Sequence, residues 1–500
     1  MKRLLDVLHP FFIALSPVLF LYAYNVEQVL VGDTLISALI VLVLAIIVLG
    51  LFSAIFRDLR KGALAASFFL ILFFSYGHLF ALKELYSIRL RYLIGGAVLL
   101  FSLGLFFIAT TRRDLRVLAR SATVFAVFLI LFSVLQITVF KIKSAYFSSR
   151  YGSSDNIKVV GNGGGPDIYY IMLDGYASNW SLREVYKYDN TLFLNALRDR
   201  GFFVVSKSRS NYPNTTFSLP SMLNMDYVEN LTSDGLITKE SYNYRDLIYN
   251  NAALKFLLAK GYTYIHVGSW WDPTRSNPHA SVNINKGYMP EFVSTLYKSV
   301  AFGPLNIKLF DTRREQYDRI YYQLDQLRNI PKRPESTFTF VHFNMSPYVF
   351  DENGGFLVFK QGDDTRFESL LEKYPQQVAF FNREVLKLID YIRETSEGDY
   401  VIILQSDHGS RVFPEEGKAS VDELEDLDIK ERLRNLSAVY LPKKDSKDLY
   451  ESMTNVNMLR VVFNNIFGTN YEILPDRSYI NVPSDHYKFV DVTERAKYED

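Results

Sequence analysis

Cysteine is absent from the 500 residues of this sequence. Disulfides, zinc–thiolate sites, iron–sulfur clusters and thiol nucleophiles are therefore excluded. Any covalent chemistry must use serine, threonine, lysine, aspartate, glutamate, histidine or tyrosine. An excess of either charge is also absent, because 55 lysines and arginines are balanced by 54 aspartates and glutamates. Nucleic-acid-binding proteins are usually basic, so this balance argues against nucleic acid as a partner.

Apolar residues are concentrated in the first 140 positions, where they form five long runs. Four of the runs hold about 20 residues with almost no charge, which is enough to cross the hydrocarbon core of a membrane. The first run is weaker because Asn25 and Glu27 interrupt it, and a cleaved signal peptide is its alternative interpretation. The sequence therefore predicts a five-helix transmembrane domain over residues 1–140. The runs are residues 10–31, 35–56, 62–82, 92–111 and 117–140.

Basic residues in the short loops predict the orientation of these helices. Nine lie on the side of the chain's first residues, and three lie on the other side. Because basic loops stay in the cytoplasm, the N-terminus is predicted to be cytoplasmic, and five crossings place everything after residue 140 outside. A cytosolic soluble domain is the alternative. The first group is Lys2, Arg3, Arg57, Arg60, Lys61, Arg112, Arg113, Arg116 and Arg120; the second is Lys83, Arg89 and Arg91.

Residues 141–165 are predicted to be a linker, and residues 166–500 an α/β domain. The linker ends in a glycine-rich run that lacks the Lys-Ser/Thr of a phosphate-binding loop. Beyond it, short apolar strands alternate with helical segments, which predicts a mostly parallel sheet covered by helices on both faces. The predicted strands are residues 168–173, 262–267, 338–343 and 400–404. The predicted helices are residues 181–200, 252–260, 376–395 and 449–467.

Polar side chains follow two of these strands directly. Asp174 follows the first strand, and Asp407 and His408 follow the strand that ends at residue 404. Ligands gather at the carboxyl ends of parallel strands, and two carboxylates with one imidazole would bind a divalent ion and leave a position open. A metal there would activate the otherwise weak hydroxyl nucleophile of Thr215. Taken singly, these residues could equally be a turn aspartate, turn residues and a helix N-cap.

Taken together and in this order, these segments resemble the alkaline phosphatase/sulfatase superfamily. More narrowly, the chain resembles its five-span, membrane-anchored transferases, the lipoteichoic acid synthases and lipid A phosphoethanolamine transferases. The resemblance implies that Asp174, Asp407 and His408 bind one divalent ion, Mn or Zn, together with a threonine nucleophile. That threonine is expected seven residues before the pair Met222-Leu223 and five before Pro220. Both counts lead to Thr215, with Thr216 as the alternative.

The sequence departs from the family patterns in two places. The run from Ser218 to Met222 lacks the arginine that sulfatases need, so sulfatase activity is not expected. The transferases carry a loop with two histidines, whereas the corresponding stretch here keeps His342 and has no second one. His342 is therefore a candidate leaving-group acid that lacks its usual companion. Arg411 is a candidate to pair with a phosphate group.

The resemblance implies a metal-dependent enzyme in the cell membrane with a sulfatase-like catalytic domain outside the cytoplasm. It would move phosphoglycerol or phosphoethanolamine from a phospholipid donor to a glycan, lipid or polymer acceptor through a threonine intermediate. One alternative is a phosphodiesterase or phosphatase, in which water is the acceptor. Another is a non-catalytic membrane protein that has retained the fold. The sequence does not choose among these, because acceptor choice depends on access to the site.

Overall fold

The computed structural model describes residues 4–27, 29–86, 88–151, 164–232, 235, 237–239, 241–287, 289–301, 311–330, 334–359, 367–413, 420–442 and 448–499. The chain divides into two compact units. One comprises Met1–Tyr146 with Met289–Thr312, and the other comprises Phe147–Tyr288 with Arg313–Asp500. A segment of the predicted catalytic domain therefore groups with the N-terminal helices.

The first unit contains η1 (Leu4–Asp6) and the helices α1 (His9–Tyr24), α2 (Val31–Phe56), α3 (Leu59–Tyr86), α4 (Leu90–Thr110) and α5 (Arg116–Tyr151). Among the described residues, four helices, α2 to α5, are long and apolar enough to cross a membrane. The first predicted run forms only the 16-residue α1. It is shorter than predicted because Asn25 ends it: the side-chain amide and the backbone N–H of Asn25 both donate to the Leu21 carbonyl.

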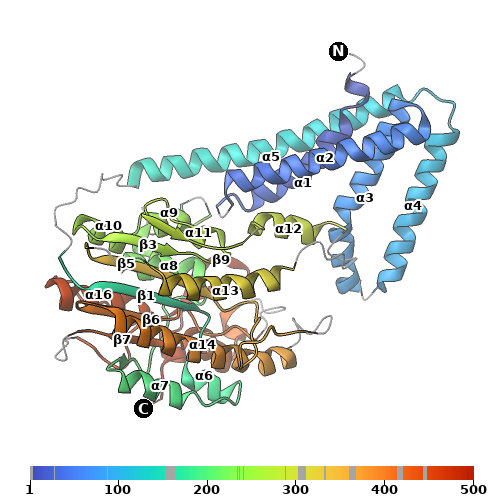
Figure 1. The fold of residues 1–500 in the computed structure, drawn as a ribbon. Helices are drawn as coiled ribbons and strands as arrows, with labels where there is room; N and C mark the ends of the chain where they lie inside the picture. Colours follow the sequence, from blue (N-terminus) through green and yellow to red (C-terminus); the bar gives the residue numbers. More distant parts are fainter. Residues whose placement is uncertain are drawn as a thin grey trace. The chain divides into compact units, whose positions relative to one another are not determined.

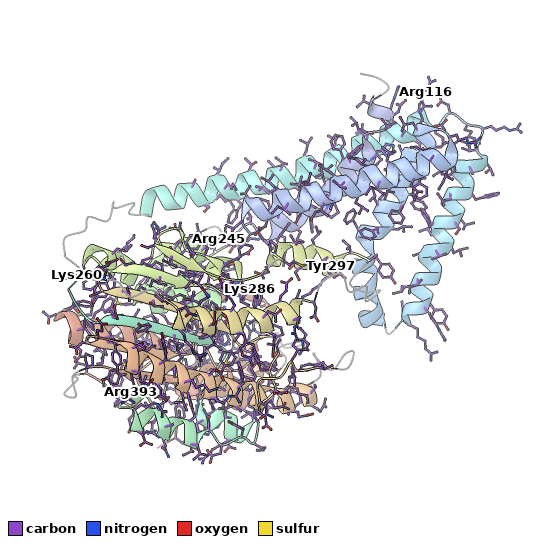
Figure 2. All side chains as sticks on the ribbon, in the orientation of Figure 1. Arg116, Arg245, Lys260, Lys286, Tyr297 and Arg393 are labelled. Carbon is purple, nitrogen blue, oxygen red and sulfur yellow. The ribbon has the colours of Figure 1, made fainter. Side chains whose placement is uncertain are left out.

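The predicted linker at 141–165 begins inside a helix. The helix α5 starts at Arg116, labelled in Figure 2, and continues to Tyr151. The helix therefore extends past residue 140, where the last apolar run was predicted to end. Residues 152–163 of the predicted linker, which hold the start of its glycine run, lie outside the described residues.

A buried carboxylate joins three parts of the first unit at one end of its helices. Asp6, at the end of η1, is 3.1 Å from Arg60 Nη2 and 2.9 Å from Arg120 Nε. Arg60 lies at the start of α3, and Arg120 lies near the start of α5. The described start of the chain, the start of α3 and the start of α5 therefore lie at the same end of the helices.

The segment that joins this unit from the C-terminal half contains the short helix α12 (Glu291–Ser299). Its apolar residues Phe292 and Leu296 are one turn apart and are buried with residues of α1, α2 and α3. The contact with α3 is close, because a Cβ on Gly77 would lie 2.0 Å from the Ser299 carbonyl oxygen. The Ala301 N–H also donates to the Phe73 carbonyl at 3.1 Å. Nothing in the local sequence pattern indicated this packing.

The second unit is built on a seven-stranded sheet with the order β2-β7-β6-β1-β5-β3-β4 (Figure 1). The pairs β1–β5, β1–β6, β3–β5 and β3–β4 are parallel, and β7 is antiparallel to both of its neighbours. The prediction of a mostly parallel sheet is thus confirmed. The strands are β1 (Asp167–Asp174), β2 (Phe203–Val204), β3 (Thr263–Val267), β4 (Val282–Ile284), β5 (Thr337–Asn344), β6 (Tyr400–Gln405) and β7 (Ser437–Tyr440).

Helices cover both faces of this sheet, and side chains fill the layers between them (Figure 2). Successive residues of a strand point to opposite faces. In β1, Ile171 and Leu173 accordingly pack in one core cluster, whereas Tyr170 and Met172 pack in the other. The first cluster includes α6 (Asn179–Glu184), α7 (Thr191–Asp199), α13 (Thr312–Arg328) and α14 (Phe367–Thr395). The second includes α8 (Thr215–Asn224), α9 (Tyr244–Tyr249), α10 (Ala252–Ala259) and α16 (Asn455–Phe467).

Three predicted helices differ from the observed ones. The helix α14 begins at Phe367, nine residues before the predicted start at 376, and it contains Pro375. The other two differ because polar side chains bond the backbone. The helix predicted over 181–200 is divided into α6 and α7, since Asp189 accepts from the Thr191 N–H between them. The helix predicted over 449–467 begins only at Asn455, where Asp476 accepts from both the N–H and the hydroxyl of the N-cap Thr454. The remaining elements are η2 (Val228–Leu231), α11 (Asp272–Arg275), η3 (Val421–Glu423), α15 (Asp426–Leu433), β8 (Tyr479–Val482), β9 (Asp485–Asp491) and α17 (Thr493–Ala496).

Candidate active site

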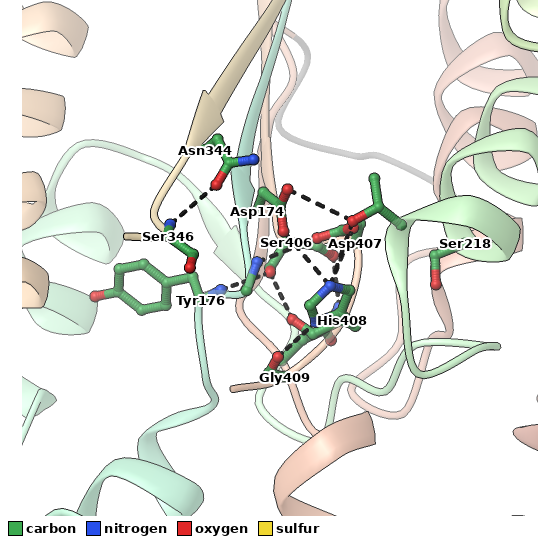
Figure 3. Close-up of polar contacts among 12 residues, drawn as sticks. Asp174, Tyr176, Ser218, Asn344, Ser346, Ser406, Asp407, His408 and Gly409 are labelled. Atoms are coloured by element: carbon green, nitrogen blue, oxygen red, sulfur yellow. Dashed lines mark hydrogen bonds and ion pairs between the residues drawn. The ribbon is translucent and has the colours of Figure 1, made fainter. Parts of the chain in front are cut away.

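The predicted acidic residues meet at one edge of the sheet. Asp174 ends β1, and Asp407 and His408 follow β6 after one residue. The two strands are parallel neighbours, with Met172 opposite Gln405, so their carboxyl ends reach the same edge. Figure 3 shows the three side chains gathered there. The Ser406 hydroxyl accepts from the Tyr176 N–H and donates to the His408 carbonyl, which holds the turn after β6.

Thr215 approaches this cluster from α8. It is the first residue of that helix, and Asn214 is the N-cap. Thr215 therefore lies inside the helix start, whereas the sequence placed it just before the helix. Its Oγ1 is 3.4 Å from His408 Nε2 and 3.5 Å from Asp174 Oδ2. The N-terminus of a helix favours a bound anion, so a phosphate group at Thr215 would be stabilised by α8.

The three predicted ligands are spaced as one metal ion requires. One ligand atom from each of Asp174, Asp407 and His408 lies within 4.8 Å of the others. His408 Nε2 is 3.4 Å from Asp174 Oδ1 and 3.5 Å from Asp407 Oδ2. Ligands to one ion sit about 2.0–2.2 Å from it. Two ligands of a tetrahedral ion are then about 3.3–3.6 Å apart, and the distances from His408 Nε2 to the two carboxylates fall in this range.

The hydrogen bonding of the same residues fits a cation. His408 Nδ1 lies 2.6 Å from the Gly409 carbonyl, so it must carry the proton and donate. In the neutral imidazole, Nε2 then presents its lone pair to two carboxylates. Asp407 Oδ2 is buried and has no hydrogen-bond partner in the described part of the chain. A divalent ion would satisfy both atoms, and the nitrogen and oxygen donors suit Zn or Mn.

The pKa values of the two carboxyl groups are shifted in opposite directions, because the groups are buried side by side. Burial and the charge of Asp174 raise the pKa of Asp407 above its ordinary value. Burial also acts to raise the pKa of Asp174, but the hydrogen bond from His342 and the nearby histidines outweigh it and leave that pKa lowered. Two like charges at this distance oppose each other's ionisation. A cation between the carboxylates would remove that conflict.

His342 lies behind the cluster. This histidine on β5 is fully buried, and it is absent from the residues that line the cavity. Its Nε2 is 3.0 Å from Asp174 Oδ2, and its Nδ1 is 2.7 Å from the hydroxyl of Thr274. The imidazole therefore bonds a carboxylate on one side and a hydroxyl on the other. This position suits a residue that orients Asp174, and Thr274 is a supporting residue that the sequence did not indicate.

A cavity of about 490 Å³ opens beside Thr215 and the acidic cluster. Arg411, the candidate to pair with a phosphate group, is one of its lining residues. Asn344 was missed, although it ends β5 directly opposite Asp174 and follows the same strand-end rule. Segments that are distant in the sequence bring the other lining residues to this edge. They include Trp270, Ser346, Tyr348, Phe413 and Arg432.

A buried glutamate supports the loop that carries Arg411. Glu431 Oε1 accepts from the Val412 N–H at 3.0 Å and from the Tyr186 hydroxyl at 3.2 Å. Its other oxygen is buried with no hydrogen-bond partner among the described residues. Burial raises the pKa of Glu431 to about 7. The carboxyl group is thus protonated in mildly acidic solution and is forced to ionise inside the protein at higher pH.

Replacing Glu431 with glutamine should change how stability depends on pH. Between pH 4.5 and about 7 the unfolded chain loses the proton that the folded chain keeps, so the free energy of unfolding falls by about 3 kcal/mol. Glu431→Gln should remove this fall and make the protein more stable than the wild type at pH 8. Thermal unfolding of the full chain in detergent at pH 5 and pH 8 measures it. The exposed Glu425→Gln is the control, and identical pH profiles for wild type and Glu431→Gln would contradict the prediction.

Comparisons with known proteins give distant structural likenesses, and no curated protein matches the sequence. The C-terminal periplasmic domain of EptC from Escherichia coli, in complex with Zn, is 14% identical with a TM-score of 0.43 over 66% of this chain and 93% of that one. The integral membrane protein lipooligosaccharide phosphoethanolamine transferase A from Neisseria meningitidis is 14% identical with a TM-score of 0.38. The match covers 87% of this chain and 88% of that one. The C-terminal periplasmic domain of phosphoethanolamine transferase EptC from Campylobacter jejuni is 10% identical with a TM-score of 0.36, over 64% of this chain and 95% of that one.

The sequence model of the sulfatase family gives a firmer result. It matches residues 166–471, which is more than half of the chain. The match begins at β1 and includes Asp174, Thr215, Asp407 and His408. It confirms the superfamily that the strand-end residues indicated. The chain belongs to the sulfatase family.

Proposed function

We propose that this protein is a metal-dependent, membrane-anchored transferase that moves a phosphate-linked head group from a phospholipid to an acceptor outside the cytoplasm. The observation that carries the proposal is the position of Thr215 Oγ1, within 3.5 Å of both Asp174 and His408. A hydroxyl held among metal ligands at a helix start is poised to attack a phosphorus atom. Membership of the sulfatase family supports a catalytic role for this edge of the sheet.

Asp174, Asp407 and His408 would hold the divalent ion, Mn or Zn. When bound, the ion would lower the pKa of the nearby hydroxyl and offset charge on the phosphoryl oxygens. His342 would fix the orientation of Asp174 from behind, as supporting residues of metal ligands commonly do. Arg411 would pair with a phosphoryl oxygen at the cavity wall. His342 would thus be a positioning residue, in place of the leaving-group acid suggested by the sequence.

The reaction would proceed in two displacements. Thr215 Oγ1 attacks phosphorus and loses its proton, the bond from phosphorus to the diacylglycerol oxygen breaks, and that oxygen is protonated. The head group, phosphoglycerol or phosphoethanolamine, is then joined to Thr215 through phosphorus. An acceptor hydroxyl of a glycan, lipid or polymer next attacks phosphorus, and the bond to Thr215 breaks. The four long apolar helices favour a lipid donor, because a soluble donor needs no membrane anchor.

The topology that places this site outside the cytoplasm rests on Asp6 as well as on loop charge. Its ion pairs with Arg60 and Arg120 put the start of the chain at the same end as the basic loops. The chain must therefore return along α1 before α2 begins at the opposite end. At 1.5 Å per residue α1 is about 24 Å long, which is about 6 Å less than a typical hydrocarbon core, so the residues that flank α1 would complete this pass. Five passes would then leave the catalytic unit outside.

Substituting Thr215 should abolish turnover and leave the fold intact. Thr215→Ala removes the attacking oxygen, so transfer should fall about a thousandfold or more, whereas Thr216→Ala should have a mild effect. Purified protein is incubated with phospholipid labelled in the head group. Label on the wild-type protein indicates the threonine intermediate, and free head group indicates that water is the acceptor. Full activity in both variants would rule out covalent catalysis by this segment.

Metal affinity should separate the two roles considered for His342. If His342 orients Asp174, His342→Ala should weaken metal binding about 10–100-fold, and His342→Gln should restore part of it by donating to the carboxylate. Asp407→Asn should lose the metal, and His279→Ala, at an exposed histidine, should retain it. Metal content and calorimetric titration of the full chain measure this. Wild-type affinity in an inactive His342→Ala variant would instead assign the residue to proton transfer.

A reporter fused after Gly165 should be active only outside the cytoplasm. The expectation follows from nine basic loop residues on one side against three on the other. A phosphatase reporter that folds only outside and a fluorescent reporter that folds only inside give opposite signals. A fusion after Arg57, in a predicted cytoplasmic loop, serves as the matched control. Cytoplasmic activity of the Gly165 fusion would overturn the orientation and the lipid-donor argument with it.

A further inference from the structure

A second cavity of about 540 Å³ lies in the second unit, which contains the seven-stranded sheet. It shares no lining residue with the cavity beside Thr215. Its walls come from four separate segments: the chain after β2, the loop before α16, the loop before β8 and the helix α17 with the residues after it. Basic side chains outnumber acidic ones among the lining residues, which are Lys207, Arg209, Glu451, Ser452, Pro475, Asp476, Arg477, Thr493, Lys497 and Tyr498.

Arg209 forms the buried part of this wall. Only 3% of its surface is exposed. Its Nη2 donates to the Asp476 carbonyl at 3.2 Å, and its Nε is buried with no hydrogen-bond partner among the described residues. Burial lowers the pKa of Arg209, although an arginine keeps its charge in proteins. A buried guanidinium with an unused donor is costly unless an anion binds it.

Two acidic groups near Arg209, Asp476 and Glu494, contact other residues. Asp476 Oδ1 accepts from Tyr450, from the N–H and hydroxyl of Thr454, and from Asn457, at 2.8–3.1 Å. The carboxylate of Asp476 therefore accepts hydrogen bonds from residues at the start of α16. Glu494 pairs with Lys497 at 2.6 Å, and both side chains are at least half exposed. In the described part of the chain neither carboxylate is hydrogen-bonded to the Arg209 guanidinium, so its buried Nε stays without an acceptor.

We propose that this cavity is a second anion-binding site that takes a phosphate group. Arginine presents paired donors that match phosphate oxygens, and Lys207 and Arg477 would add charge at the rim. The hydroxyls of Ser452 and Thr493 line the same space and can donate to a phosphate. The site is separate from the metal centre, and it does not depend on the proposed transfer reaction.

The cavity is connected by hydrogen bonds to the segment that carries the proposed nucleophile. Asn211, two residues after Arg209, donates through its side-chain amide to the Arg477 carbonyl at 2.8 Å. The same side chain accepts from the Val456 N–H at 2.9 Å. The chain then continues from Asn211 to α8, which starts at Thr215. The Arg477 backbone is therefore linked through Asn211 to the chain that leads into α8.

Binding of inorganic phosphate tests the proposal. The full chain carries Asp407→Asn and is treated with chelator, so that phosphate does not bind at the metal centre. Titration followed by ³¹P NMR should show saturable binding. Arg209→Met, which preserves the volume of the side chain, should weaken binding about tenfold or more, because hydrogen bonds to charged groups are strong. If Arg209→Met does not fold, the exposed rim variant Arg477→Gln should still weaken binding severalfold. Arg198→Gln, at an exposed arginine outside the cavity, should leave it unchanged.

Vesicles identify the source of the phosphate group. Binding of the same protein to phosphatidylglycerol vesicles is compared with binding of Arg209→Met and Arg477→Gln. A loss of both phosphate binding and vesicle binding assigns the site to a lipid phosphate, and a loss confined to inorganic phosphate assigns it to a soluble one. Both results support the site. Unchanged binding of phosphate and of vesicles in both variants would overturn it.

Discussion

Two carboxylates and the lone pair of an imidazole converge in a buried space at the edge of the sheet, and this concentration of negative charge organises the catalytic unit. Asp174 and Asp407 oppose each other's ionisation when no cation lies between them, and His408 Nε2 faces both carboxylates. The two carboxylates lie close together because β1 and β6 are parallel neighbours, and their carboxyl ends therefore lie at the same edge of the sheet. The fold thus creates an electrostatic conflict that a divalent ion would resolve, and a site of this kind can also activate a hydroxyl.

The residues around this cluster hold it in one geometry. His342 contacts Asp174 on one side and Thr274 on the other, which restricts the carboxylate to one orientation. Ser406 holds the turn after β6, and Glu431 bonds the loop that carries Arg411. Because these groups are buried, each can be satisfied only by a specific partner. The site is therefore positioned by the packed interior, while the ligand-facing side chains remain at the cavity.

The first unit shows a similar dependence on a few buried polar contacts among apolar helices. Between helices in a membrane the hydrophobic effect provides little attraction, so close packing and polar contacts set the arrangement. Asp6 joins the start of the chain to two basic residues, and Gly77 lets α12 approach α3 closely. The segment containing α12 lies in the C-terminal half of the sequence but groups with the helices of the first half. The two units are thus interleaved along the chain.

Local patterns in the sequence were sufficient to predict the apolar runs and the main strands of the sheet. They were also sufficient to identify the strand-end residues Asp174, Asp407 and His408. These features depend on periodicity within short windows, and parallel strands bring their ends to one edge in any such sheet. Thr215 followed from a resemblance, and the structure places it beside the same cluster. The position of His342 behind Asp174, the support from Glu431, the buried cation of Arg209 and the grouping of α12 were decided only by tertiary structure. Each of these depends on contacts between residues that are distant in sequence, and only the folded chain determines which distant segments meet and which polar groups are buried.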